Sequence, residues 1–156
     1  MKKHITGFLA CVALIASATA AAPPSPAQGC DRECLRSHIT QILWALVRHD
    51  VSKLPVADTL RVTEDADEKK LKDVALVRSV TALRGYRQDF IDERTGVAGA
   101  HTMVEESGAP IMLVVRIKVV DNKLTELELV PTRSRAEGLI FNLDGLGYLG
   151  YEAVIS

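Results

Sequence analysis

Hydrophobic residues change their spacing about half-way along the chain, and this change predicts the fold class. Before residue 84 they recur every three to four residues in two stretches, which is the spacing of one helix face. From residue 85 onward the spacing changes: residues 85–91 and 123–130 alternate apolar and polar residues and residues 109–120 form a β-branched run, which is typical of strands. We therefore expect an α+β protein in which helices come first and an antiparallel sheet follows.

The first half contains the clearest predicted helix, over residues 31–49, with Asp31 as its N-cap. A second helix is predicted over residues 73–83, where Asp73 can serve as the cap. Between them the pattern predicts a break at Leu54-Pro55 with room for one helical turn, a strand over 59–64, a polar turn at 65–67 and a short segment at 69–71. The apolar stripe of the first helix comprises Leu35, Ile39, Ile42, Leu43, Leu46 and Val47.

The second half predicts an antiparallel meander. Its strands cover residues 85–91, 97–106, 109–120 and 123–130, with turns at Thr95-Gly96, Ser107-Gly108 and Asp121-Asn122. Residues after 132 have no clear period, so we expect an irregular tail over residues 134–156.

Charge pairing predicts the register of the last hairpin. A three-residue turn at residues 121–123 places Arg116 opposite Glu128 and Lys118 opposite Glu126, and such pairs are favourable by roughly 0.2–1 kcal/mol. A two-residue turn would oppose charged residues to apolar ones. The predicted core face then carries Leu113, Val115, Ile117 and Val119, with Thr125, Leu127 and Leu129.

The neighbouring hairpin decides where His101 lies. A two-residue loop at Ser107-Gly108 places His101 opposite Val114 and Gly99 opposite Arg116. His101, Arg116 and Glu128 would then lie near one another on one side of the sheet. A turn one residue longer would move His101 to the apolar face instead.

The first twenty residues predict an export signal. Lys2 and Lys3 precede an uncharged apolar stretch over residues 5–16, and Ala18-Thr19-Ala20 offers a signal-peptidase site. The stretch is shorter than the ~20 residues that span a bilayer. We expect cleavage after Ala20, a flexible leader over residues 21–29, a single domain over residues 30–133, and export to the periplasm or the medium without a membrane anchor.

Cys30 and Cys34 follow the leader, and an exported protein meets an oxidising space where a disulfide forms. Residues four apart on a regular helix are about 5–6 Å apart at Cβ, too far for a disulfide, which needs about 3.5–4.5 Å. With Asp31 as N-cap, Cys30 lies outside the helix and can fold back. Two free thiols are the alternative, and no paired histidines follow that would indicate zinc.

Composition excludes several classes of protein. Without Lys2 and Lys3 the chain has 17 Lys and Arg against 20 Asp and Glu, a net charge of −3, which argues against a nucleic-acid binder. Hydrophobic residues at 47% and charged residues at 25% indicate a folded chain. No P-loop, dinucleotide fingerprint or GxSxG motif occurs, so we expect no nucleotide cofactor and propose no cofactor.

Several short motifs resemble the α+β cone of the nuclear-transport-factor-2-like and SnoaL-like superfamily. They are Trp44-Ala45-Leu46 with His49-Asp50, Leu54-Pro55, residues 61–64, and residues 116–118 followed by residues 124–128. The chain looks most like an exported branch of unknown function that opens with a similar cysteine pair. The resemblance covers residues 30–133 and implies a curved antiparallel sheet covered by N-terminal helices, an apolar pocket, and members that are enzymes, ligand binders or dimers.

Two functions follow as hypotheses. In the first, a cofactor-independent lyase or isomerase acts on an apolar or aromatic substrate: His101 moves a proton, Arg116 stabilises negative charge and Glu128 orients either group. Trp44, Tyr86 and Phe90 would then line the substrate pocket. In the second, the domain is a noncatalytic ligand-binding or dimerisation module, with charged structural pairs on a dimer face.

The other histidines predict no metal site. His38 and His49 are separated by about 16 Å along the first helix and cannot share an ion, and we expect both to be partly exposed.

Overall fold

The computed structural model describes residues 29–133, so the predicted signal segment, nearly all of the leader and the tail lie outside the described residues. The elements are α1 (Arg32–Val47), β1 (Val56–Glu64), β2 (Asp67–Lys69), the 3-10 turn η1 (Leu71–Asp73), α2 (Leu76–Ser79), β3 (Val80–Asp92), β4 (Val97–Glu106), β5 (Ala109–Val120) and β6 (Lys123–Thr132). Neither described helix is long and apolar enough to cross a lipid bilayer.

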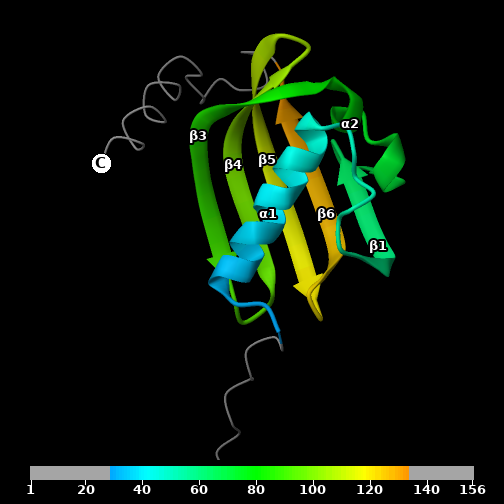
Figure 1. Ribbon diagram of the computed structural model, residues 1–156, viewed down its shortest axis with the longest axis vertical. Coiled ribbons are helices and arrows are strands. Elements are labelled where there is room, and N and C mark those ends of the chain that lie inside the picture. The colour runs from blue at the N-terminus through cyan, green and yellow to red at the C-terminus, as the bar shows by residue number, and fades with distance from the viewer. Residues whose placement is uncertain (1–28, 134–156) are drawn as a thin grey trace, which may run out of the picture.

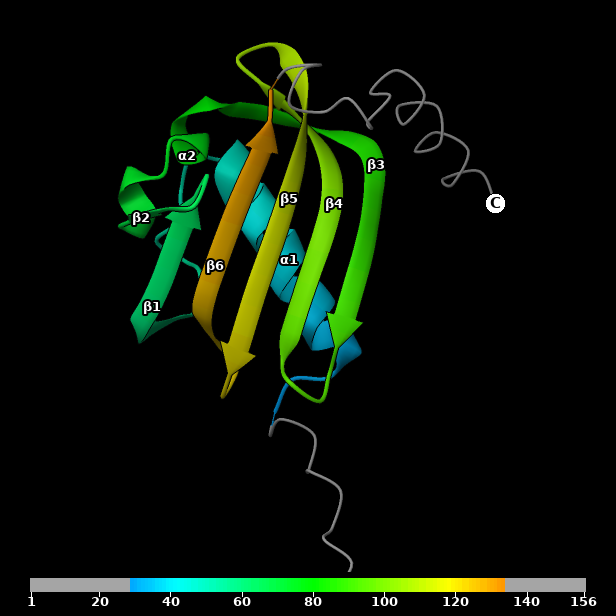
Figure 2. The same ribbon diagram turned by 180° about the vertical axis from the view of Figure 1, so that it is seen from behind.

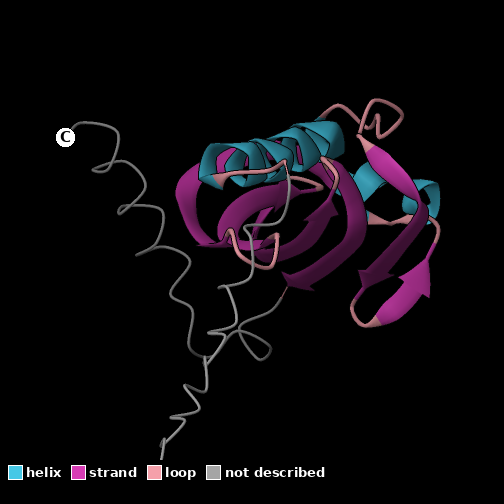
Figure 3. Cartoon of the chain, turned by 90° about the horizontal axis from the view of Figure 1, so that it is seen from below, coloured by secondary structure: helices cyan, strands magenta, loops and turns pink. Residues whose placement is uncertain are grey.

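A six-stranded sheet in the order β2-β1-β6-β5-β4-β3 forms the body of the domain. All neighbouring strands run antiparallel except β1 and β6, which run parallel and join the N-terminal hairpin to the meander. Helix α1 lies diagonally across one face (Figure 1), and the view from below shows the sheet curving around it (Figure 3). The predicted fold class, a curved sheet covered by an N-terminal helix, is confirmed.

The start of α1 is stabilised as the sequence predicts. The side chain of Asp31 accepts a hydrogen bond of 2.9 Å from the backbone N–H of Cys34, which satisfies one of the free donors of the first turn. Cys30 lies before the helix and forms a disulfide with Cys34, with their Cα atoms 5.1 Å apart. The predicted cap and the predicted disulfide are both confirmed.

The core lies between α1 and the sheet. Alternate residues of β5 (Leu113, Val115 and Ile117) are fully buried, and Leu35 and Ile39 of α1 meet them from the other layer. Helix α1 contacts β3, β4 and β5. The period-two pattern of the sequence therefore identified the buried face of β5 and most of that of β6, where Leu124 and not the predicted Thr125 is fully buried.

The prediction of a helix over residues 73–83 is wrong. Only residues 76–79 form a helix, α2, and β3 begins at Val80, which pairs with Glu106 of β4. Leu76 and Val80 are both fully buried, so the helical spacing of apolar residues was real. Pairing with a strand far along the chain overrides that local pattern.

The last hairpin keeps its predicted pairs with a different turn. Arg116 lies opposite Glu128 and Lys118 opposite Glu126, as predicted, but the turn has two residues, Asp121 and Asn122, both with positive φ. The register shifts after Lys118, which leaves Thr125 as the extra residue of a bulge in β6. The β4–β5 register is confirmed throughout, with His101 opposite Val114 and Gly99 opposite Arg116.

Glu64 ties α2 to the end of β1. The residue is only 1% exposed. Its carboxylate accepts hydrogen bonds from Lys69 Nζ at 2.6 Å and from the backbone N–H groups of Ala75 and Leu76, both at 2.9 Å. Burial alone would raise the pKa of Glu64, but these donors outweigh it and hold the pKa below its ordinary value. The charged form therefore stabilises the fold at neutral pH, and this contribution is lost as the pH falls through the carboxyl range.

We expect Glu64→Gln to lower the free energy of unfolding by about 2 kcal/mol at pH 7, because a buried network loses its charged acceptor. The deficit should shrink as the pH falls below about 4.5, the ordinary pKa of a glutamate, because the unfolded chain then takes up a proton more readily than the native state does. Urea denaturation at pH 7 and pH 4 measures both effects. Glu68→Gln is the control, since its side chain is 69% exposed, and it should change stability by less than about 0.5 kcal/mol. Equal effects of the two variants would contradict the role of Glu64.

Candidate functional site

The face of the sheet that points away from α1 carries the predicted catalytic residues His101, Arg116 and Glu128, and we call it the open face. Phe90, Gly99, Arg116 and Glu128 lie in one row across β3, β4, β5 and β6, and His101 is the next residue of β4 on the same side. Figure 2 shows this face in front of α1, with no described helix over it. Towards the β4–β5 turn the same face buries Met103 and Met112, which lie opposite each other.

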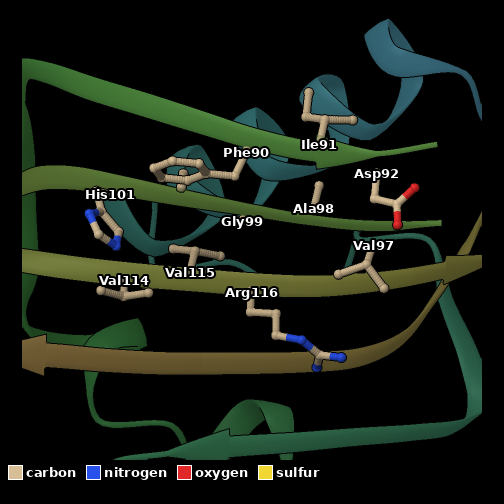
Figure 4. A pocket seen from close by; sticks show the side chains of 11 residues that line it. Phe90, Ile91, Asp92, Val97, Ala98, Gly99, His101, Val114, Val115 and Arg116 are labelled. Carbon is tan, nitrogen blue, oxygen red and sulfur yellow. The ribbon is translucent and has the colours of Figure 1, made fainter. Parts of the chain in front are cut away.

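Gly99 leaves a shallow hollow in this row. Because it has no side chain, the surface between Phe90 and Arg116 falls to the level of the backbone, and the hollow has a volume of about 410 Å³. A Cβ at Gly99 would lie 3.2 Å from the carbonyl oxygen of Val115, so the close approach of β5 also favours glycine. The residues around the hollow are shown in Figure 4 and are Phe90, Ile91, Asp92, Val97, Ala98, Gly99, Ala100, His101, Val114, Val115 and Arg116.

His101 contacts Phe90 at one edge of the hollow. Their ring centroids are 5.3 Å apart with an interplanar angle of 68°, an edge-to-face arrangement. Phe90 is 50% exposed and His101 is partly exposed, so both rings line an open surface. The structure thus brings His101 to the side of the sheet that the register predicted.

Arg116 is held by carboxylates of β6. Its Nη1 donates to Glu126 Oε2 at 2.8 Å and to Glu128 Oε1 at 2.9 Å, while Lys118 Nζ lies 3.9 Å from Glu126. Figure 4 shows the guanidinium extending over β6, away from His101. The hydrogen bond with Glu126 is the main cause that raises the pKa of Arg116 and lowers the pKa of Glu126. Arg116 is therefore firmly cationic and already paired within the chain.

The predicted aromatic residues are not gathered in one place. Phe90 lines the hollow, and the hydroxyl of Tyr86 donates to Gln88 two residues along β3 at 3.2 Å. Trp44 lies on α1, is 44% exposed, and has the guanidinium of Arg48 at 5.5 Å from its ring centroid. Of the three, only Phe90 lies beside His101 and Arg116.

The burial of His38 and the contact of Glu126 with Arg116 were not predicted from the sequence. We expected His38 to be partly exposed, but it is 5% exposed, and burial lowers its pKa below the ordinary value. Its position three residues after Leu35 and four before Ile42 was the available signal, because that spacing places it in the apolar stripe. Glu126 lies two residues before Glu128 on the same face of β6, and this spacing was the available signal that it could be a second partner of Arg116.

Comparisons with known proteins indicate the fold only. No protein-family model matches the chain, and no related curated protein is found. A designed protein with a curved β-sheet matches with 15% identity and a TM-score of 0.54, over 76% of this chain and 98% of that one. AclR from Streptomyces galilaeus, named as a candidate hydroxylase, matches with 15% identity and a TM-score of 0.53, over 75% of this chain and 87% of AclR. A designed NTF2 fold protein matches with 15% identity and a TM-score of 0.39, over 72% of this chain and 91% of that one. The first two matches indicate that this chain shares their overall fold.

We expect Arg116→Met to raise the pKa of the Glu126 side chain towards its ordinary value, because the variant removes the main donor to that carboxylate. Carboxyl-carbon NMR titration of Glu126 measures the shift. Lys123→Met removes a nearby exposed cation of the β5–β6 turn and is the control, for which we expect no change. An unchanged Glu126 in Arg116→Met would show that the pair does not persist in solution.

Proposed function

We propose that this protein is a noncatalytic association module that forms a homodimer through its open face. The observation that supports it is the register at the centre of the sheet. In the strand order, β6 and β5 are the two central strands, and each row across them joins a residue to its complement. The rows are Val114 with Val130, Arg116 with Glu128 and Lys118 with Glu126.

This pattern is complementary to itself. Consider two copies stacked face to face, with a two-fold axis midway between their sheets that runs parallel to the strands above the boundary of β5 and β6. This axis would place β5 of one copy directly over β6 of the other, with no shift along the strands. Glu128 of the second copy would then face Arg116, and its Val130 would face Val114. The two basic and two acidic groups balance, so two such faces meet without net repulsion.

Exposed apolar side chains supply surface for such a contact. Val130 is 45% exposed, Val120 is 44% exposed and Phe90 is 50% exposed, and all three lie on the open face. Aromatic residues and arginine are enriched in interfaces relative to the rest of a protein surface. Apolar burial would supply affinity, and the charged rows would fix the orientation of the two copies.

We expect the chain to be a dimer at micromolar concentration and Val130→Lys to be a monomer, because each interface would then bury two unpaired cations. Size-exclusion chromatography with light scattering measures the mass. Trp44→Lys is the matched control, since Trp44 is exposed to the same degree on the opposite side of the domain, and it should remain dimeric.

A charge exchange tests the orientation. Arg116→Glu should weaken the dimer at least tenfold, and adding Glu128→Arg should restore it in part, because the exchange keeps the pair between positions 116 and 128 within and between the copies while it removes the bond to Glu126. A monomeric parent chain, or a dimer that Trp44→Lys disrupts as much as Val130→Lys, would contradict the proposal.

The hollow beside Gly99 supports a second candidate function, the binding of a small aromatic molecule. Its lining is mostly apolar, and the Phe90 and His101 rings at its edge can contact a third ring edge-to-face. A catalytic role for His101 with Arg116 and Glu128 stays a prediction. The open position of His101, and the pairing of Arg116 with two carboxylates, favour binding over proton transfer.

We also propose that the protein is exported. The disulfide between Cys30 and Cys34 is compatible with an oxidising compartment and supports this proposal, together with the signal-like sequence of residues 1–20.

A further inference from the structure

Three soft metal ligands meet at the start of α1, on the edge of the domain where the chain enters it (Figure 1). Cys30, Cys34 and His38 each offer one donor atom, and these atoms all lie within 4.8 Å of one another. The cluster follows from the sequence spacing. Cys34 and His38 are four residues apart on one helix face, and the disulfide brings Cys30 back onto that face.

His38 provides an independent sign that the cluster has a polar role. The residue is 5% exposed, and its Nδ1 has no hydrogen-bond partner among the described residues. An unsatisfied polar atom in such a place is costly, and an apolar residue of similar size would fill the stripe without that cost. The imidazole lies beside two sulfur atoms that, in the disulfide, offer it no strong donor.

We propose that Cys30, Cys34 and His38 form a redox-dependent binding site for one thiophilic d10 cation, Cu(I) or Zn²⁺. In the oxidised protein the disulfide closes the site. In the reduced protein two thiolates and the imidazole hold the ion, which then ties Cys30 to the helix as the disulfide does.

The chemistry balances with a dithiol as reductant. The dithiol transfers two electrons and two protons to the Cys30–Cys34 bond, which breaks to give two thiols while the dithiol becomes a cyclic disulfide. Binding of the ion then displaces the two thiol protons to solvent, because thiolates are the ligands. Cys34 is only half-buried, so a reductant can reach its sulfur.

The dimensions of the cluster suit such an ion. Metal–sulfur bonds of about 2.3 Å and metal–nitrogen bonds of about 2.0 Å separate the donors by roughly 3.5–4 Å in trigonal or tetrahedral sites. The three donor atoms lie within 4.8 Å of one another in the oxidised protein, so after reduction side-chain rotations would separate the two sulfur atoms and bring the imidazole closer to form the site. Two thiolates are soft donors and an imidazole is a borderline one, and this set favours Cu(I) or Zn²⁺ over hard cations.

Asn122 should distinguish the binding of Zn²⁺ from the binding of Cu(I). Its Oδ1 lies 3.5 Å from Cys34 Sγ, in the turn between β5 and β6 that packs over the cysteines. Cu(I) is satisfied by three ligands, whereas Zn²⁺ requires a fourth, from Asn122 or from water. The affinity of Zn²⁺, and not that of Cu(I), should therefore respond to Asn122→Ala.

The experiment uses the full chain with Cys11→Ser, so that Cys30 and Cys34 are its only cysteines. The protein is reduced with a phosphine, and Zn²⁺ or Cu(I) is titrated in competition with a chromophoric chelator. We expect one ion per chain in the reduced protein and none in the oxidised protein. His38→Gln should weaken binding at least tenfold, and Cys34→Ser should abolish it.

The matched control is His49→Gln, which removes an exposed imidazole at the other end of α1 and should leave the affinity unchanged. A second readout needs no variant: ring resonances of His38, and not those of His49, should shift when the ion binds. Binding by the oxidised chain, no binding by the reduced chain, or a His38 whose signals and substitution have no effect would each overturn the proposal. Because the site lies on α1, its failure would leave the dimer proposal untouched.

Discussion

The two-residue period of the central strands is the constraint on which the rest of the structure depends. In β5 one set of alternate side chains, including Val115 and Ile117, is fully buried under α1, while Arg116 and Lys118 between them point to the other side. A slip of one residue would place both cations in the core, at a cost of several kcal/mol per charge. The packing of α1 on one face therefore fixes what the opposite face presents, and both the core and the candidate interface follow from it.

Patterns that are complete within one segment could be predicted from the sequence. Residues 109–120 form a run rich in β-branched residues, turn residues bound both this run and residues 97–106, and β4 and β5 have those bounds. The region of residues 73–83 could not be predicted, because Leu76 and Val80 satisfy a helix and the observed helix–strand junction equally well. What decides between them is the pairing of Val80 with Glu106, which lies in a distant strand. The bulge at Thr125 belongs to the same kind: it reconciles a favoured two-residue turn with the favoured charge pairs.

In the candidate site, too, the features that depend on local patterns could be predicted and those that depend on distant contacts could not. Register alone brought His101 and Arg116 to one face, since it depends on turn lengths that the sequence displays. The hollow depends on the missing side chain of Gly99 between larger neighbours on the open face, and Trp44 is far from it because α1 covers the opposite face of the sheet. Glu64 left no local signal at all, because its backbone donors belong to residues 75 and 76, beyond the following turn and β2.

The charged rows of the open face bear on how two copies would associate. Each pair is already formed within the chain, where Arg116 bonds two carboxylates, so a second copy cannot gain the full energy of new ion pairs. Burying them also removes water from charges that are now partly exposed, which offsets much of the attraction. Net affinity must therefore come from apolar contact around Val114 and Val130, and the charges act mainly by penalising every other alignment of the two sheets. In such an interface the charged rows determine the orientation of the two copies and contribute little to their affinity.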